Sequence, residues 1–83
     1  MITQRPAYDY AALGVAISKA RRAAELTVEA LGERSGVSRR HLIDIEQGNK
    51  KVSAGLLYAI AAGLGIDGGD LFREGYPDSA RDS

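Results

Sequence analysis

A chain of 83 residues forms one domain with a modest core, so its stability is expected to be marginal and to gain from self-association. It contains no cysteine, which excludes disulfides, cysteine-based zinc sites and thiol chemistry. It has neither a signal-peptide pattern nor an apolar run near the roughly 18 residues of a membrane span. We therefore expect a soluble, cytoplasmic protein. The net charge of zero predicts weak non-specific affinity for DNA, although the charge is +3 over residues 1–24, zero over 25–51 and −3 over 52–83, which allows one face to be basic.

The first predicted helix runs from about residue 9 to residue 24. Asp9 can cap its N-terminus, since a carboxylate accepts a hydrogen bond from the free amides of the first turn. Leu13, Ile17 and Ala20 recur at helical spacing and give the helix one apolar face.

Two short helices follow, joined by a turn. The second begins at Thr27, with Glu29 in its positive first turn, and stops near Gly36. The third begins at Ser38 and ends at Gly48. Both starts carry a hydroxyl residue that favours the helix N-cap, and both ends carry a glycine that favours the helix C-cap.

Two further helices complete the predicted fold. The fourth begins after Ser53 and ends at Gly65, and Asp67 caps a short fifth helix that holds Leu71 and Phe72. The sequence thus predicts an all-α domain of five helices.

The predicted domain occupies residues 9–73. Residues 1–8 are interpreted as an N-terminal tail, and residues 74–83 as a flexible C-terminal tail, because the latter are rich in Ser and Asp and contain Pro77.

The segment from residue 27 to residue 48 has the spacing of a helix-turn-helix unit. Small residues are expected where the two helices approach closely: Ala30 or Gly32 in the first helix, and Gly36 in the turn. Glycine inside a helix costs about 1 kcal/mol relative to alanine. We interpret Gly32 as a point where the helices cross closely, in preference to a point of flexibility. Three apolar residues can lock the pair from beneath: Val37, Leu42 and Ile45.

Several segments carry a resemblance to a known family: Leu13-Gly14 with Ile17 and Arg21, Leu26-Thr27-Val28-Glu29-Ala30-Leu31, Gly36-Val37-Ser38, Ile45-Glu46-Gln47-Gly48, and Ile60-Ala61-Ala62-Gly63-Leu64-Gly65-Ile66 with Leu71-Phe72. In this order and spacing, they resemble the Cro/C1-type (XRE) helix-turn-helix family over roughly residues 10–73. The resemblance implies a compact five-helix, lambda-repressor-like domain that binds double-stranded operator DNA, usually as a homodimer.

The resemblance places the recognition helix between Ser38 and Glu46, with its N-terminal end in the major groove. It implies that Arg39, Arg40 and Asp44 face the bases. Arginine can donate to guanine O6 and N7 together, whereas Asp44 could accept from cytosine N4 or orient a neighbouring arginine.

The same resemblance implies a set of DNA backbone contacts: Thr27, Val28, Ser38, His41, Lys50, Lys51 and Ser53. Many family members carry glutamine where Val28 stands. Because valine has no side-chain donor, that contact would fall to the backbone amide or to Thr27.

The resemblance also implies one structural ion pair, and the residues themselves suggest a dimer interface. Arg21 and Glu46 match a partly buried ion pair of the family, which would fix the recognition helix to the first helix. Leu71, Phe72 and Tyr76 form the candidate dimer interface, unless Leu71 and Phe72 pack onto their own core. A dimer is also expected because one recognition helix reads only about four or five base pairs.

Other interpretations of these residues stay open. The arginines, Asp44 and the lysines could be a solvated surface, and Tyr58 is expected to pack rather than to recognise DNA. A metal role for His41 is disfavoured, because the chain has no cysteine and no second histidine.

The sequence offers neither a nucleophile–histidine–acid set nor a phosphate-binding loop, so we expect no enzyme, cofactor, metal or small-molecule ligand. The alternative function is a protein-interaction module such as an antitoxin, for which the acidic final third and its aromatic residues would supply the surface.

Overall fold

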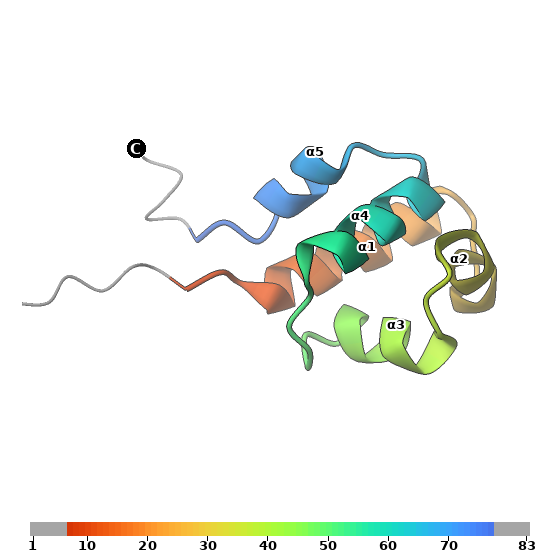
Figure 1. Cartoon of the computed structure of the whole chain (residues 1–83), viewed down its shortest axis with the longest axis horizontal. Coiled ribbons are helices and arrows are strands. Elements are labelled where there is room, and N and C mark those ends of the chain that lie inside the picture. The colour runs from red at the N-terminus through yellow and green to blue at the C-terminus, as the bar shows by residue number, and fades with distance from the viewer. Residues whose placement is uncertain (1–6, 78–83) are drawn as a thin grey trace, which may run out of the picture.

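The computed structural model describes residues 7–77, which form an all-α fold (Figure 1). The described residues contain five helices in the predicted order, so the predicted fold class is confirmed. Their bounds are α1 (Tyr10–Ala23), α2 (Val28–Ser35), α3 (Arg39–Glu46), α4 (Ala54–Leu64) and α5 (Gly68–Arg73). The longest, α1, has 14 residues, and no helix of the described part has the length and apolar content needed to cross a bilayer.

Every helix begins at the predicted cap. In each case the side-chain oxygen of the cap accepts a hydrogen bond from the backbone amide three residues further on, which satisfies a donor that the helix leaves free. The caps are Asp9, Thr27, Ser38, Ser53 and Asp67. Gly36 ends α2 with φ of +75°, a left-handed conformation that glycine adopts without steric cost.

The core contains apolar residues that the helical spacing turns inward, together with Val37 and Val52 from the segments between helices. Twelve are buried: Leu13, Ile17, Leu31, Val37, Leu42, Ile45, Val52, Leu57, Ile60, Ala61, Leu64 and Leu71. Helix α4 packs against α2 and α5, and α1 packs against α3 and α5. Figure 1 shows α3 and α5 on opposite sides of α1 and α4, which overlap in this view.

Two predictions about small residues have different outcomes. A Cβ on Gly32 would lie 2.8 Å from the carbonyl oxygen of Val37, so this glycine does allow a close approach, although to the turn rather than to a crossing helix. A Cβ on Gly36 would meet nothing within 4 Å. The expectation of close packing at Gly36 is therefore wrong, and its role is conformational.

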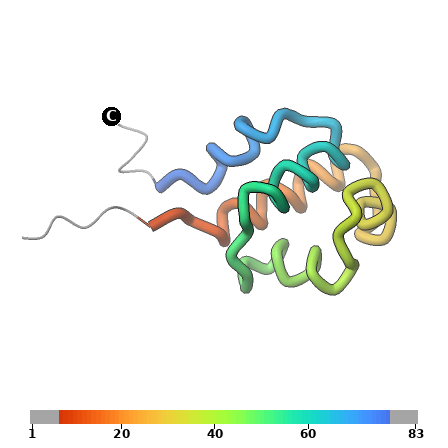
Figure 2. Tube along the Cα trace, viewed as in Figure 1, coloured from red at the N-terminus to blue at the C-terminus, as the bar shows by residue number. Residues whose placement is uncertain are grey.

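Residues on both sides of the predicted domain pack against α5. The Tyr8 hydroxyl donates to the carbonyl oxygen of Phe72 at 2.7 Å, and the Asp9 amide donates to the carbonyl oxygen of Gly75 at 2.7 Å. Figure 2 shows the two ends of the described chain at the same end of the molecule. Part of what the sequence assigns to tails thus belongs to the packed structure, whereas residues 1–6 and 78–83 lie outside the described residues.

One residue of the predicted dimer interface belongs to the core instead. Leu71 is 2 % exposed and packs with the buried residues of its own chain. Its assignment to an intermolecular surface is therefore wrong, because the side chain has no area left to offer. Phe72 and Tyr76 are 41 % and 39 % exposed.

Candidate nucleic-acid interface

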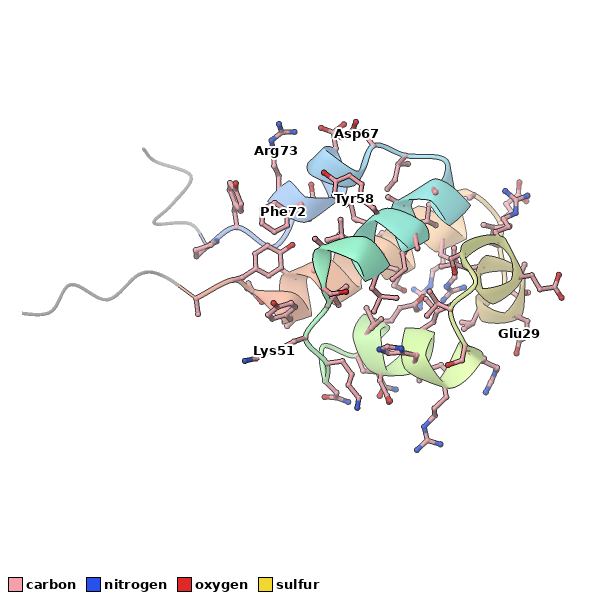
Figure 3. The ribbon with its side chains drawn as sticks, in the orientation of Figure 1. Glu29, Lys51, Tyr58, Asp67, Phe72 and Arg73 are labelled. Carbon is pink, nitrogen blue, oxygen red and sulfur yellow. The ribbon has the colours of Figure 1, made fainter. Side chains whose placement is uncertain are left out.

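Helix α3 has one buried face and one outward face. Leu42 and Ile45 are buried, whereas Arg39 and Arg40 at the N-terminal end are exposed. In Figure 3, side chains of α3 extend away from the body of the molecule, on the side opposite α5. The helix therefore presents its arginine-bearing end without a covering element from the described residues.

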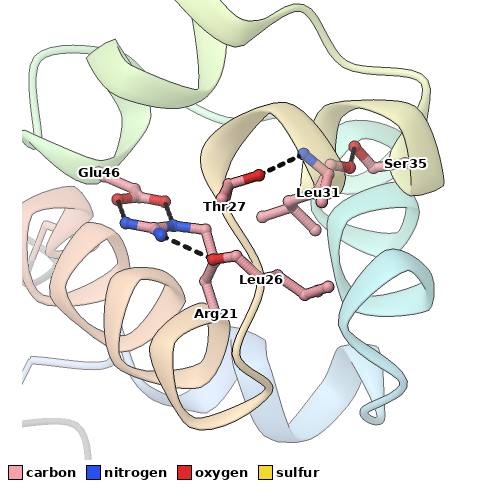
Figure 4. Close-up of polar contacts among 7 residues, drawn as sticks. Arg21, Leu26, Thr27, Leu31, Ser35 and Glu46 are labelled. Atoms are coloured by element: carbon pink, nitrogen blue, oxygen red, sulfur yellow. Dashed lines mark hydrogen bonds and ion pairs between the residues drawn. The ribbon is translucent and has the colours of Figure 1, made fainter.

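The C-terminal end of α3 is fixed by a bidentate ion pair. Arg21 of α1 donates from Nε to Glu46 Oε2 at 2.7 Å and from Nη2 to Glu46 Oε1 at 3.0 Å (Figure 4). The two side chains are only 13 % and 11 % exposed. Arg21 Nη1 also donates to the carbonyl oxygen of Leu26 at 2.9 Å. The bonds to Glu46 raise the pKa of Arg21, so the guanidinium stays charged.

A second ion pair lies at the start of α3. Arg39 Nε is 2.5 Å from Oε2 of Glu29, the second residue of α2. Both side chains are 61 % exposed. The sequence predicts Glu29 in the first turn of α2 but gives no sign of its contact with Arg39. The two residues are ten positions apart, and their contact depends on the angle between the helices.

The other predicted base-facing residues differ in their surroundings. Arg40 is exposed, and its side chain has no ion pair or hydrogen bond within residues 7–77. Asp44 is half-buried, and its carboxylate likewise has no partner in the described part of the chain. The suggestion that Asp44 orients an arginine is not what this structure contains, because the carboxylate beside Arg39 is that of Glu29. His41 is half-buried, and its amide donates to the Ser38 hydroxyl.

Three of the predicted backbone-contacting residues are helix caps. The hydroxyls of Thr27, Ser38 and Ser53 each accept a hydrogen bond from a backbone amide, at 3.0, 3.2 and 3.2 Å. A hydroxyl that accepts still keeps its own hydrogen as a donor, and the first amides of each helix keep theirs. Val28 is half-buried against the core, so only its amide is suited to contact a phosphate.

Basic residues of the loop between α3 and α4 lie on the same side. Lys50 and Lys51 are exposed. Figure 3 shows Glu29 and Lys51 flanking α3 at its two ends, whereas Asp67, Phe72 and Arg73 lie on the opposite side of the molecule. Exposed arginines and lysines thus lie on α3 and in the loop that follows it, with Glu29 beside them, whereas Asp67 and Asp70 lie at α5 beside Arg73.

The aromatic residues gather at the α5 end. Phe72 stacks on Tyr8 with ring centroids 4.9 Å apart, and Tyr76 meets the edge of Phe72 at 5.2 Å. Burial raises the pKa of the Tyr8 phenol. Phe72 and Tyr76 together leave an exposed aromatic surface away from the arginine end of α3. Tyr58, on α4, packs its ring over Gly68 but is 57 % exposed.

Comparisons with known proteins agree with this geometry. The helix-turn-helix family model matches residues 17–71, more than half of the chain. The clp gene regulator ClgR from C. glutamicum is 32 % identical, with a TM-score of 0.76, over 88 % of this chain and 94 % of that chain. The restriction-modification controller protein C.AhdI from Aeromonas hydrophila is 28 % identical, with a TM-score of 0.73, over 76 % of this chain and 96 % of that chain. No curated protein matches the sequence.

Proposed function

The chain belongs to the Cro/C1-type helix-turn-helix family of DNA-binding transcriptional regulators, and we propose that it binds a palindromic or pseudo-palindromic operator as a homodimer. The observation that supports this proposal is the exposed, arginine-bearing start of α3, held on a rigid pair of helices. Occupancy of the operator, rather than chemistry, would be the output. The similarity to C.AhdI favours a regulator of the repressor or controller type. We place its action in the cytoplasm, where such an operator lies, and assign it no catalytic step.

We assign base recognition to the outward residues of α3. Arg39 and Arg40 each carry a guanidinium that can donate two parallel hydrogen bonds to the major-groove edge of guanine. Asp44, one turn further along, can accept from cytosine N4. Each such contact is worth about 1–3 kcal/mol of discrimination against the wrong base pair.

We assign the DNA backbone to the helix starts and the basic loop around α3. The hydroxyls of the caps and the first amides of α2 and α4 are suited to phosphate oxygens, because helix N-termini attract anions. These contacts set the register without reading sequence. The assigned residues are Thr27, Val28 through its amide, Ser38, His41, Lys50, Lys51 and Ser53.

We assign dimerisation to the aromatic end. One α3 reads about four or five base pairs, which is too few for useful selectivity, so two copies are needed. Phe72 and Tyr76 remain as the candidate interface after Leu71 is assigned to the core.

A protein-interaction module is the second candidate, and one observation favours it. A groove between α1 and α5 is lined by apolar and charged residues: Ala16, Lys19, Ala20, Ile66, Asp70, Leu71 and Glu74. Ile66 and the neighbouring Val15 are 39 % and 51 % exposed. Such a groove suits a protein partner, as in an antitoxin.

Selection of bound duplexes from a random pool separates the two candidates. A DNA regulator should recover two inverted half-sites whose centres lie about 10 base pairs apart, one helical turn. Recovery of no consistent sequence would favour the protein-interaction module.

Variants then locate the contacts on the selected duplex. Arg39→Ala and Arg40→Ala should each relax preference at one base position, at a cost of about 1–3 kcal/mol. Lys50→Ala should instead weaken all sequences alike and reduce the salt dependence of binding by about one ion. If both arginine variants bind the selected duplex as the parent does, the assigned surface is wrong.

A further inference from the structure

Glu29 and Arg39 join two ordered helix ends. The Arg39 Nε to Glu29 Oε2 distance is 2.5 Å. The starts of α2 and α3 are both fixed by side-chain caps, at Thr27 and Ser38. The pair therefore spans two anchored positions and does not connect a helix to a loose loop.

Packing behind the pair fixes the separation of the two helices. A Cβ on Gly32, one turn beyond Glu29, would lie 2.8 Å from the carbonyl oxygen of Val37 and 4.0 Å from the amide nitrogen of Arg39. The turn that leads into α3 thus rests directly on α2, and the first residue of α3 lies at van der Waals distance from it. Because the backbone positions are already fixed, the ion pair has only the side-chain torsions of Glu29 and Arg39 to order.

Glu29 holds Arg39 at Nε, which leaves the two terminal guanidinium nitrogens available for a base. Glu29 engages Nε, and no other hydrogen bond within the described residues engages the guanidinium. Both terminal nitrogens therefore keep donors for the parallel pair of bonds that guanine O6 and N7 accept. A guanidinium already held at Nε has less rotational freedom to lose when it binds a base.

Glu29 is also well suited to remain an anion at this site. Hydrogen bonds from its own backbone amide and from Arg39 lower the pKa of the Glu29 carboxyl. Arg40, the next residue on α3, has no such acidic partner among residues 7–77. The two arginines of the outward face thus differ in whether an acidic side chain holds them, although they are adjacent in the sequence.

We propose that Glu29 is a positioning residue for sequence recognition. It holds the Arg39 guanidinium end-on toward a guanine edge, and its charge offsets the attraction of Arg39 to phosphates of any sequence. The inference rests on the proposed function, in which Arg39 reads a base. It adds a specificity determinant on α2, outside the recognition helix.

The test compares Glu29→Gln with Glu33→Gln in the full chain. Glu33 is exposed, lies one turn further along α2 and has no side-chain partner among the described residues, so its variant removes the same charge without touching Arg39. The probes are the duplex selected by the parent chain and the same duplex with each base pair changed in turn. Glu29→Gln should reduce the preference for guanine at one position about two- to fivefold, the range of an exposed ion pair. It should also tighten binding to an unrelated duplex.

Glu33→Gln should keep the parent's base preference, and thermal melts should show that both variants remain folded. If Glu29→Gln also keeps that preference while Arg39→Ala loses it, the positioning role is wrong and the proposed function stands. If Arg39→Ala itself keeps the preference, α3 does not read that base through Arg39, and the inference falls with that part of the proposed function.

Discussion

The Arg21–Glu46 pair is a bidentate and largely buried polar contact. Both carboxylate oxygens accept from the guanidinium, and the remaining Nη1 donates to the Leu26 carbonyl. Each side chain keeps only about a tenth of its exposure. Such a pair adds little net stability over apolar residues, but it fixes geometry, because a single charge left there would lack both water and a partner.

Removal of Arg21 alone should therefore be costly. Arg21→Met leaves the Glu46 carboxylate nearly buried and unpaired, and it should lower the free energy of unfolding by about 2–4 kcal/mol. Urea denaturation measures the loss. Arg22→Met is the control, since Arg22 is exposed, has no partner within residues 7–77, and should shift stability by less than about 0.5 kcal/mol.

A double variant separates the lost charge balance from lost packing. Arg21→Met combined with Glu46→Leu leaves no buried charge and should recover most of the stability. Equal stability of Arg21→Met and the parent would contradict the interpretation.

At the scale of elements, α1 and α3 meet through backbone. A Cβ on Gly14 would overlap the carbonyl oxygen of Ile45 and lie 2.8 Å from that of Glu46. The last turn of α3 therefore rests on α1 with no side chain between them. This contact and the neighbouring ion pair set the angle at which α3 leaves the body.

Gly14→Ala tests that contact. The added methyl group has no room, so the two helices must separate, and we expect a loss of about 1–3 kcal/mol in the free energy of unfolding. Gly55→Ala is the matched control in α4, because a Cβ there meets nothing within 4 Å. It should be neutral or stabilising by up to about 1 kcal/mol, since alanine favours the helix. Parallel thermal or urea melts would compare the two, and equal effects would contradict the close approach.

Sequence patterns predicted the elements well because caps and glycine ends are local. Asp9, Thr27 and Ser38 each need only an amide three residues away. Contacts between helices were harder to predict from the sequence. The Glu29–Arg39 pair depends on an interhelical angle, and α5, with six residues, is too short for periodicity to decide which of Leu71 and Phe72 faces inward.

Part of the candidate site was visible in the sequence and part was not. The outward position of Arg39 and Arg40 follows from the inward spacing of Leu42 and Ile45. The inequality of the two arginines does not, because it comes from a residue on another helix.

At the scale of the whole molecule, two chemically different surfaces lie apart. Exposed basic residues lie on α3 and in the loop after it, whereas Phe72 and Tyr76 lie at the α5 end with Tyr8 and Tyr10 beside them. In the proposed function, one surface meets DNA while the other meets a second copy. The proposal therefore predicts that DNA binding and dimerisation can be altered separately.

Tyr76→Ala should weaken the proposed dimer and leave the monomer folded, because Tyr76 is 39 % exposed and lies at the edge of the aromatic group. An interface aromatic of this kind contributes about 1–2 kcal/mol, so the dimer dissociation constant should rise about tenfold or more. Sedimentation at several concentrations measures it. Tyr58→Ala, which removes an exposed ring from α4, is the control and should leave the constant unchanged. A parent that stays monomeric at roughly tens of micromolar and on DNA would contradict the dimer.

The hydrogen bond from Asp9 to Gly75 closes the described chain almost into a ring. A short linker between these positions would make the ring covalent, and new termini could then open in the exposed turn at Gly65–Asp67, away from α3. Such a circular permutant would begin with α5 and present the same arginines on the same scaffold. The order of these helices in the sequence is thus separable from the folded arrangement that presents α3.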